Sequence, residues 1–456
     1  MEFDTHMKQV RKYFTQDELI AKVRESFVES LRKSNVYDNS FSTISNVDCL
    51  MSGLAIFSFK FPSLLQFDKT RNEKGALFKN LKKLFLLEEC PCDTYMRERL
   101  DVLDPKLCRQ AFRSLFSLLQ RGKILDNFRF FGDYHLISID GTGVFFSDSV
   151  HCDNCNVIEH RDGSVTYNHQ ILAAALVNPD QKVVYPFAPE PIMKTDGSEK
   201  NDCERNAFKR WSVDFRREHP HLKSIILADA LSSNEPFIRI LRENRLNFIL
   251  VCKEADHKYL TDYIRAADKE KTSLDTDIDS VKRHYEYILN VPLNATNQDC
   301  LVNVVRFSET KMVSKGRGKN KITKEKTTNW MWVTDLPVNL NNIEEFVKGG
   351  RARWKIENET INTLKNQGYN FEHNFGHGKK HLHTVFAHLM LLAFFIDQCL
   401  QQVNKRFQEA LNKVGGKSAL WEAIRACLKY IELPNFETLY DLIIRPPPPV
   451  IAKSVI

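Results

Sequence analysis

The stretch YHLISIDGTG, residues 134–143, marks the point at which the sequence changes from helix-like to strand-like periodicity. A run of apolar residues leads into Asp140, and a Gly-Thr-Gly triplet follows it. A carboxylate on a central strand with glycines beside it leaves room for a backbone or a phosphate group to approach. A second apolar run, KSIILADALSS at 223–233, stops at Asp229. Open α/β sheets place their ligands at such strand ends, although an aspartate there is more often a turn or helix cap.

The segments around these two aspartates alternate between strand and helix patterns. Strands are expected at 165–178, 182–192 and 248–253, and helices at 203–219 and 236–245. Three strands followed by helix, strand, helix and strand predict an α/β layer. This is the order of a ribonuclease-H-like fold, provided that one more helix follows.

That helix is delayed by a β-rich segment. The sequence therefore predicts an α/β chain with a ribonuclease-H-like core, a β-rich insertion before the last core helix, and an N-terminal helical domain. The chain is expected to divide into a helical DNA-binding or dimerisation region at 1–130, the first part of the core at 131–257, the insertion at 258–345, the last core helix and following segment at 346–395, and a C-terminal helical region with a Pro-rich tail at 396–456.

A third carboxylate stands on the delayed helix, in RARWKIENETINTLKNQ at 351–367. At 100° per residue, Glu357 falls within the apolar arc that holds Trp354 and Leu364, whereas Glu359 projects to the opposite side. An acidic group on an apolar face is costly to bury unless it is paired or binds a metal. A salt bridge to Arg353, four residues earlier, is the alternative.

The motif R-A-R-W-K-I-E at 351–357 resembles the Y-x2-R-x3-E-x6-K signature of the DDE transposases of bacterial insertion sequences, in the cut-and-paste branch with a β-rich insertion. Gly350 stands at the tyrosine position, and Lys365 comes one residue later than the lysine of the family. The resemblance implies that Asp140, Asp229 and Glu357 are the catalytic residues. They would hold two Mg²⁺ ions, for which Mn²⁺ can substitute.

The same resemblance implies contacts with DNA. Trp330 lies four residues before Thr334, as in relatives in which this tryptophan stacks on a flipped base. The alternative is that Trp330 and Trp332 alternate across a strand and one of them is core. The other expected DNA-binding residues are Arg353, Lys365 and Lys253, and Lys315, Arg317, Lys319 and Lys321 in a basic loop between 311 and 326. For this loop, solvated disorder is the alternative.

These features predict a DNA transposase that cleaves transposon ends and transfers the strands into target DNA. Its partners would be double-stranded DNA, both terminal inverted repeats and target, and a second copy of the chain, since two ends must be brought together. Two alternatives stay open. One is a nuclease of the same fold that cuts without joining, and the other is an inactive, transposase-derived DNA-binding regulator.

Composition is compatible with this prediction without requiring it. The 456 residues carry a net charge of +7, which is modest for the length. The N-terminus begins polar and charged, and the apolar run LMLLAFFI at 389–396 is far shorter than a bilayer span. The expectation is a cytoplasmic, nucleoid-associated protein with reduced thiols and no membrane contact.

The cysteines and histidines suggest a metal site only weakly. Cys152 and Cys155 have the spacing of half a zinc knuckle, and Cys90 and Cys92 are the candidates for the other half. Because a single Cys-x2-Cys pair is usually unligated, structural Zn²⁺ is not expected. The segment FEHNFGHGKKHLH at 371–383 is assigned to a DNA-facing loop with Lys379 and Lys380. Its histidines are His373, His377, His381 and His383.

Overall fold

The computed structural model describes residues 14–38, 42–193, 203–267, 271–315 and 322–448. Its N-terminal part is helical, as the sequence predicts. The helices are α2 (Gln16–Lys33), α3 (Asn46–Ser58), α4 (Leu64–Glu73), α5 (Ala76–Leu84), α6 (Asp93–Asp101) and α7 (Arg109–Arg121). Thr15 caps α2 by accepting the Glu18 N–H, which satisfies a donor that the first turn leaves unpaired.

A mixed sheet of 12 strands follows these helices. Its strands are β1 (Arg129–Phe130), β2 (Tyr134–Ser147), β3 (Asn156–Glu159), β4 (Val165–Val177), β5 (Tyr185–Pro186), β6 (Glu190–Ile192), β7 (Ser224–Ala228), β8 (Asn247–Val251), β9 (Thr272–Ile278), β10 (Val281–Pro292), β11 (Leu301–Lys315) and β12 (Ile322–Thr334). The main path runs β3-β4-β2-β7-β8-β12-β11-β10-β9, with β1 beside β2 and with β5 and β6 beside β4.

The central strands combine two directions. β2 and β4 form a long antiparallel hairpin, whereas β2, β7 and β8 run parallel to one another. The connections between the parallel strands carry α8 (Glu204–Glu218) and α9 (Glu235–Glu243). A turn follows β4, with the Asp180 N–H donating to Asn178 Oδ1 at 2.9 Å. Because β2, β7 and β8 are parallel, their carboxyl ends lie at one edge of the sheet.

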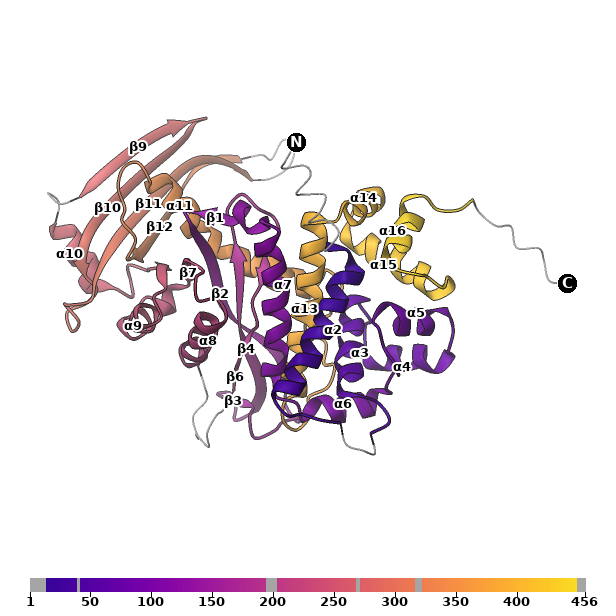
Figure 1. Cartoon of the computed structure of the whole chain (residues 1–456). Helices are drawn as coiled ribbons and strands as arrows, with labels where there is room; N and C mark the ends of the chain where they lie inside the picture. The colour runs from indigo at the N-terminus through magenta and orange to yellow at the C-terminus, as the bar shows by residue number, and fades with distance from the viewer. Residues whose placement is uncertain (1–13, 39–41, 194–202, 268–270, 316–321, 449–456) are drawn as a thin grey trace.

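The β-rich segment extends this sheet instead of forming a separate one. After α10 (Lys258–Ala266), strands β9 to β12 continue away from the N-terminal helices (Figure 1), and β12 joins the sheet by pairing with β8. The pairs from Lys311 with Lys326 to Lys315 with Ile322 place both flanks of the predicted basic loop on β11 and β12. The expectation of a loop over the whole of 311–326 is therefore wrong at its flanks, and 316–321 lie outside the described residues.

The segment that carries Glu357 is helical but irregular. It begins as α11 (Ile343–Arg351), tightens into the 3-10 turn η7 (Ala352–Trp354), widens into the π-helical stretch η8 (Ile356–Ile361) and ends as α12 (Asn362–Asn366). A regular rotation of 100° per residue does not hold across such changes, and π-helical insertions are frequent at functional sites. Trp354, which the regular helix would bury, is 51% exposed.

Helix α13 (Leu382–Val403) lies between the N-terminal helices and the sheet (Figure 1). It is long and apolar enough to cross a bilayer, but its apolar window is wholly buried inside the protein, so it acts as a core helix. Helices α14 (Lys405–Val414), α15 (Lys417–Tyr430) and α16 (Phe436–Ile444) follow it. A buried ion pair of 2.7 Å between Lys60 and Asp397 ties the N-terminal helices to α13.

Candidate metal and nucleic-acid site

Asp140 and Asp229 lie at equivalent positions on neighbouring parallel strands. The pairing of β2 with β7 ends at Ser138 and Leu227, and each aspartate is two residues further along the chain, Asp140 still within β2 and Asp229 directly after β7. β7 stops at this point, whereas β2 continues beside β4, so Asp140 stands where its neighbour strand gives way to a turn. Asp229 also caps that turn, since its Oδ1 accepts the Leu231 N–H at 3.1 Å. The cap is the ordinary structural role that the sequence left open for this residue.

Glu357 is brought to the same strands by its neighbours. The Ser138 hydroxyl donates to the backbone carbonyl of Arg353 at 2.8 Å, which fastens the 3-10 turn to β2 two residues before Asp140. Arg353 is 6% exposed and donates to Glu357 Oε1 at 2.7 Å. The salt bridge considered from the sequence is thus formed. The negative charge of Glu357 also raises the pKa of Asp140, after the larger effect of burial. Glu359 instead interacts electrostatically with Lys417, whose pKa is lowered by burial and raised in part by this negative charge.

A fourth acid, Glu204, joins this group and was not expected. It is the first residue of α8, and a Cβ added to Gly141 would lie 2.2 Å from its Oε1. The glycine beside Asp140 therefore makes room for a carboxylate of the protein itself. A local signal existed in the glycine next to Asp140, but nothing in the sequence between them indicated that residue 204 would be its neighbour.

Burial and the neighbouring acids raise the pKa values of two of these carboxyl groups. Burial raises the pKa of Asp140 from 3.8 to about 7, and the negative charges of Glu357, Glu204 and Asp229 add to the rise, against the opposing effect of Arg353. Burial likewise raises the pKa of Glu204, with Asp229 contributing. Like charges gathered at a half-buried edge favour either protonation or a bound cation.

The donor set of this acidic group suits a hard divalent cation. Four carboxylates offer only oxygen ligands, which Mg²⁺ and Mn²⁺ prefer, and the pKa of Asp140 is raised first by burial and then by the charge of Glu357. Arg353 supplies one positive charge, held by Glu357. The residues present therefore fit the Mg²⁺ that the sequence implies.

Two of the expected DNA-contact residues line one groove. Lys253 and Trp330 border a pocket of about 670 Å³ together with Arg306 and His284, beyond the carboxyl end of β8. The Trp330 ring stacks on Phe307, with 5.3 Å between ring centroids. The pocket is thus walled by an aromatic ring and Lys253, whereas Arg306 is paired there with Glu254 at 2.7 Å and with Glu286 at 3.2 Å. Aromatic rings combined with basic side chains are used by proteins that hold nucleic-acid strands.

The two tryptophans of β12 differ in burial although they lie on the same face of the strand, because side chains two residues apart in a strand point the same way. Trp332 is fully buried and is the core residue of the pair, whereas Trp330 is half-buried on the groove. A Cβ added to Gly350 would lie 2.7 Å from Trp332 Cε2. The indole therefore occupies the space above position 350, which explains in packing terms why a tyrosine is absent there.

The remaining predicted contacts are dispersed or outside the described part. Lys365 pairs with Glu372 at 3.0 Å. The backbone of Lys315 lies in β11, and the three other basic residues of the loop, Arg317, Lys319 and Lys321, lie outside the described residues.

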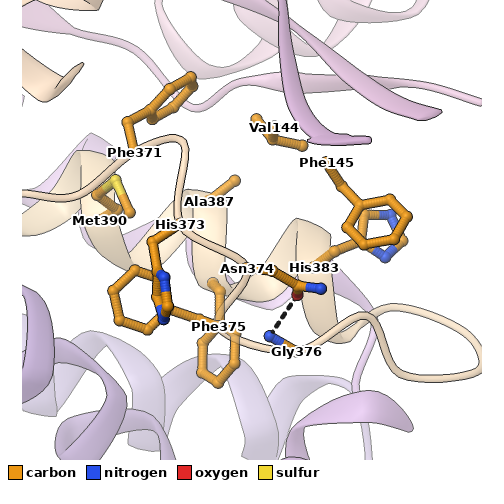
Figure 2. A pocket seen from close by; sticks show the side chains of 11 residues that line it. Val144, Phe145, Phe371, His373, Asn374, Phe375, Gly376, His383, Ala387 and Met390 are labelled. Carbon is orange, nitrogen blue, oxygen red and sulfur yellow. Dashed lines mark hydrogen bonds between the residues drawn. The ribbon is translucent and has the colours of Figure 1, made fainter. Parts of the chain in front are cut away.

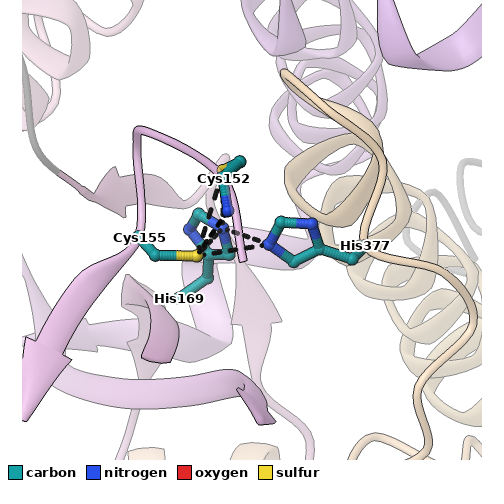
Figure 3. A group of neighbouring side chains, drawn as sticks. All are labelled: Cys152, Cys155, His169 and His377. Atoms are coloured by element: carbon teal, nitrogen blue, oxygen red, sulfur yellow. Dashed lines mark hydrogen bonds between the residues drawn. The ribbon is translucent and has the colours of Figure 1, made fainter. Parts of the chain in front are cut away.

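The cysteines and histidines are arranged differently from the expectation. Cys152 and Cys155 lie with His169 and His377, and the ligand atoms of these four side chains are all within 4.8 Å of one another (Figure 3). Cys90, the candidate partner from the sequence, is buried among the N-terminal helices. The assignment of His377 to a DNA-facing loop is wrong, because its side chain is buried in this cluster.

Beside the cluster, the segment before α13 packs over β2. Phe371, Phe375 and Phe145 line a pocket of about 30 Å³ with His383 of α13 (Figure 2). That volume holds one or two water molecules and no organic ligand. The pocket therefore belongs to the packing of the segment and offers no binding site for a substrate.

No protein-family model matches the chain, and no curated protein matches it either.

Proposed function

We propose that this protein is a DDE-type DNA transposase, which cleaves transposon ends and joins them to target DNA. The observation that carries the proposal is the placement of Asp140 and Asp229 beside each other where β7 ends, with Glu357 near enough to add to the rise that burial causes in the pKa of Asp140. Polynucleotidyl transfer with two metal ions uses such a group of carboxylates.

The strand arrangement supports a ribonuclease-H-like core within the mixed sheet. In the sheet, β4 is antiparallel to β2, and β2, β7 and β8 are parallel neighbours with α8 and α9 in their connections; this arrangement is compatible with the succession of strands and helices along the chain on which the proposal is based. The irregular helix that carries Glu357 takes the place of the delayed last core helix. Before that helix in the chain, strands β9 to β12 correspond to the proposed insertion.

In this proposal the protein's own residues bind and position the reacting groups. Asp140, Asp229 and Glu357 would hold the Mg²⁺ ions, with Glu204 as a fourth carboxylate. Bound Mg²⁺ supplies activation of a water or 3′-hydroxyl for in-line attack and stabilisation of the leaving oxygen. Arg353 fixes Glu357 through their 2.7 Å ion pair, so we assign it a positioning role.

The groove bordered by Lys253, Arg306 and Trp330 is the proposed path of one DNA strand. Exposed basic side chains on the β11–β12 hairpin, including Lys324 and Lys326, extend this path. Such cations add sequence-independent affinity for phosphates. A homodimer on paired transposon ends remains part of the proposal.

The test uses DNA that carries the chromosomal sequence on both sides of the gene, incubated with the protein, Mg²⁺ and a target plasmid. The proposal expects cleaved ends and joined products, both lost in Asp140→Asn and Glu357→Gln. Asp133→Asn is the matched control, because Asp133 is exposed and precedes the same strand.

The two alternatives give other results in the same assay. Cleavage without joining by the unaltered protein would identify a nuclease. Retention of DNA in a binding assay, with neither cleavage nor joining under any divalent cation, would identify a DNA-binding regulator. Unchanged activity of Asp140→Asn would refute the metal mechanism for every enzyme considered.

A further inference from the structure

The Cys/His cluster joins three segments that are distant in the sequence. Cys152 and Cys155 belong to the loop between β2 and β3, His169 belongs to β4, and His377 lies in the segment between α12 and α13 (Figure 3). His169 and His377 are 208 residues apart in the chain. Cysteine and histidine in equal number are the ligands of a common class of structural zinc sites.

Five of the six distances between these ligand atoms are close to those of a tetrahedron, and the sixth, from Cys152 Sγ to His377 Nε2, is within 4.8 Å. A Zn²⁺ ion with bonds of ~2.3 Å to sulfur and ~2.05 Å to nitrogen separates its ligands by about 3.8 Å (S to S), about 3.6 Å (S to N) and about 3.3 Å (N to N). The two sulfurs are 3.9 Å apart. His169 Nε2 lies 3.5 Å from Cys152 Sγ and 3.2 Å from Cys155 Sγ. His377 Nε2 lies 3.3 Å from Cys155 Sγ and 3.0 Å from His169 Nε2.

The surrounding contacts prepare these atoms to act as ligands. His377 Nδ1 is 2.7 Å from the Gly378 carbonyl, so it donates its proton there and leaves the Nε2 lone pair directed at the cluster. The His169 ring stacks on His383, with 3.4 Å between centroids, which fixes its plane. The Cys152 N–H lies 3.4 Å from Cys155 Sγ, a contact that favours a thiolate.

The cluster is also closed. Cys155, His169 and His377 are buried and Cys152 is half-buried, so four protein ligands complete a tetrahedron without an open position for a substrate. Closed sites of this kind are structural, whereas catalytic zinc sites retain a water-bearing position. The sulfurs at 3.9 Å are far from the ~2.05 Å of a disulfide.

We propose that Cys152, Cys155, His169 and His377 bind one structural Zn²⁺ ion, which fastens the segment before α13 to the β2–β4 hairpin. On its other side, the segment is held by Asp101, whose carboxylate accepts four successive N–H groups, from Lys379 to Leu382. The ion would thus hold the segment between α12 and α13 on one side, and Asp101 holds it on the other. The proposal does not depend on the transposase activity.

The test measures zinc by elemental analysis on the purified full chain, loaded with ZnSO₄ and then desalted. We expect one Zn²⁺ per chain in the unaltered protein, and less than a tenth of that in Cys155→Ser and His377→Asn. Cys92→Ser and His373→Asn are matched controls from the other cysteine pair and the same histidine segment, and they should keep the full amount. Absence of zinc in the unaltered protein, or full zinc in Cys155→Ser, would overturn the proposal.

A second measurement on the unaltered protein covers the case in which the variants fail to fold. Replacement by Co²⁺ should give intense visible absorption of a tetrahedral ion and near-ultraviolet charge-transfer bands from two thiolates. Weak octahedral absorption without those bands would overturn the proposal, as would a mass decrease that shows a Cys152–Cys155 disulfide in the isolated protein. Removal of the ion should also accelerate backbone hydrogen exchange in residues 371–381, while exchange in α2 stays unchanged.

Discussion

Replacing Asp140 with asparagine should stabilise the protein when no divalent cation is present. The displacement of the Asp140 pKa from 3.8 to about 7 corresponds to about 4 kcal/mol against its ionised form in the fold. Because the side chain is half-buried, solvent screening reduces this to about 1–2 kcal/mol. The acids that face it, Glu357, Glu204 and Asp229, remain in the variant, so the gain reflects the removal of one charge.

The pH dependence of this gain follows from linkage. A carboxyl whose folded pKa lies above its unfolded pKa stabilises the fold at low pH, and this contribution is lost as the pH rises from 3.8 through about 7. The advantage of Asp140→Asn should therefore be larger at pH 8 than at pH 5.

Urea denaturation in buffer free of Mg²⁺ and Mn²⁺, followed by tryptophan fluorescence, measures the gain. Added Mg²⁺ should then stabilise the unaltered protein and leave Asp140→Asn nearly unchanged. Asp133→Asn, at an exposed position, should behave like the unaltered protein in both buffers. The reasoning would be refuted if Asp140→Asn were less stable than the unaltered protein at pH 8 without divalent cations. It would also be refuted if Mg²⁺ raised the free energy of unfolding of both proteins equally.

Three further changes test other parts of the structure. Lys60→Met should lower the free energy of unfolding by about 3–5 kcal/mol, because it leaves Asp397 buried without its cation, and the double variant with Asp397→Asn should regain part of this in urea titrations. Gly350→Ala should cost about 1–3 kcal/mol by overpacking against Trp332, seen as a lower melting temperature. Burial lowers the pKa of His388 to about 4, so protonation in the unfolded chain should reduce stability by about 2 kcal/mol between pH 7 and pH 5. Equal acid losses in the unaltered protein and His388→Gln would contradict that assignment.

The α/β part of the fold could be predicted because its signals are local. The apolar run before Asp229 ends where β7 ends, and the expected helix at 203–219 corresponds to α8. What the sequence did not reveal is how the β-rich segment attaches. The pairing of Trp332 with Val251 makes β12 the neighbour of β8, and nothing in either strand taken alone specifies that partner.

The candidate site shows the same division. Asp140, Asp229 and Glu357 were named from strand ends and helix phase, yet Glu204 required the packing of a helix start against Gly141. Helix phase selected Glu357 although the 3-10 and π-helical turns break the regular rotation on which that phase was based. The Cys/His cluster was missed because spacing arguments look for ligands nearby, whereas this group draws its members from three separate segments.

The most direct test of the central claim is a count of Mn²⁺ ions bound by the chain, with the Cys/His cluster already loaded with zinc. Electron paramagnetic resonance titration should show two Mn²⁺ ions per unaltered chain, close enough for their spins to couple. In Asp140→Asn the coupled signal should disappear. An unaltered chain that binds no Mn²⁺, or an Asp140→Asn chain with the same coupled pair, would contradict the assignment of these carboxylates as a two-metal site.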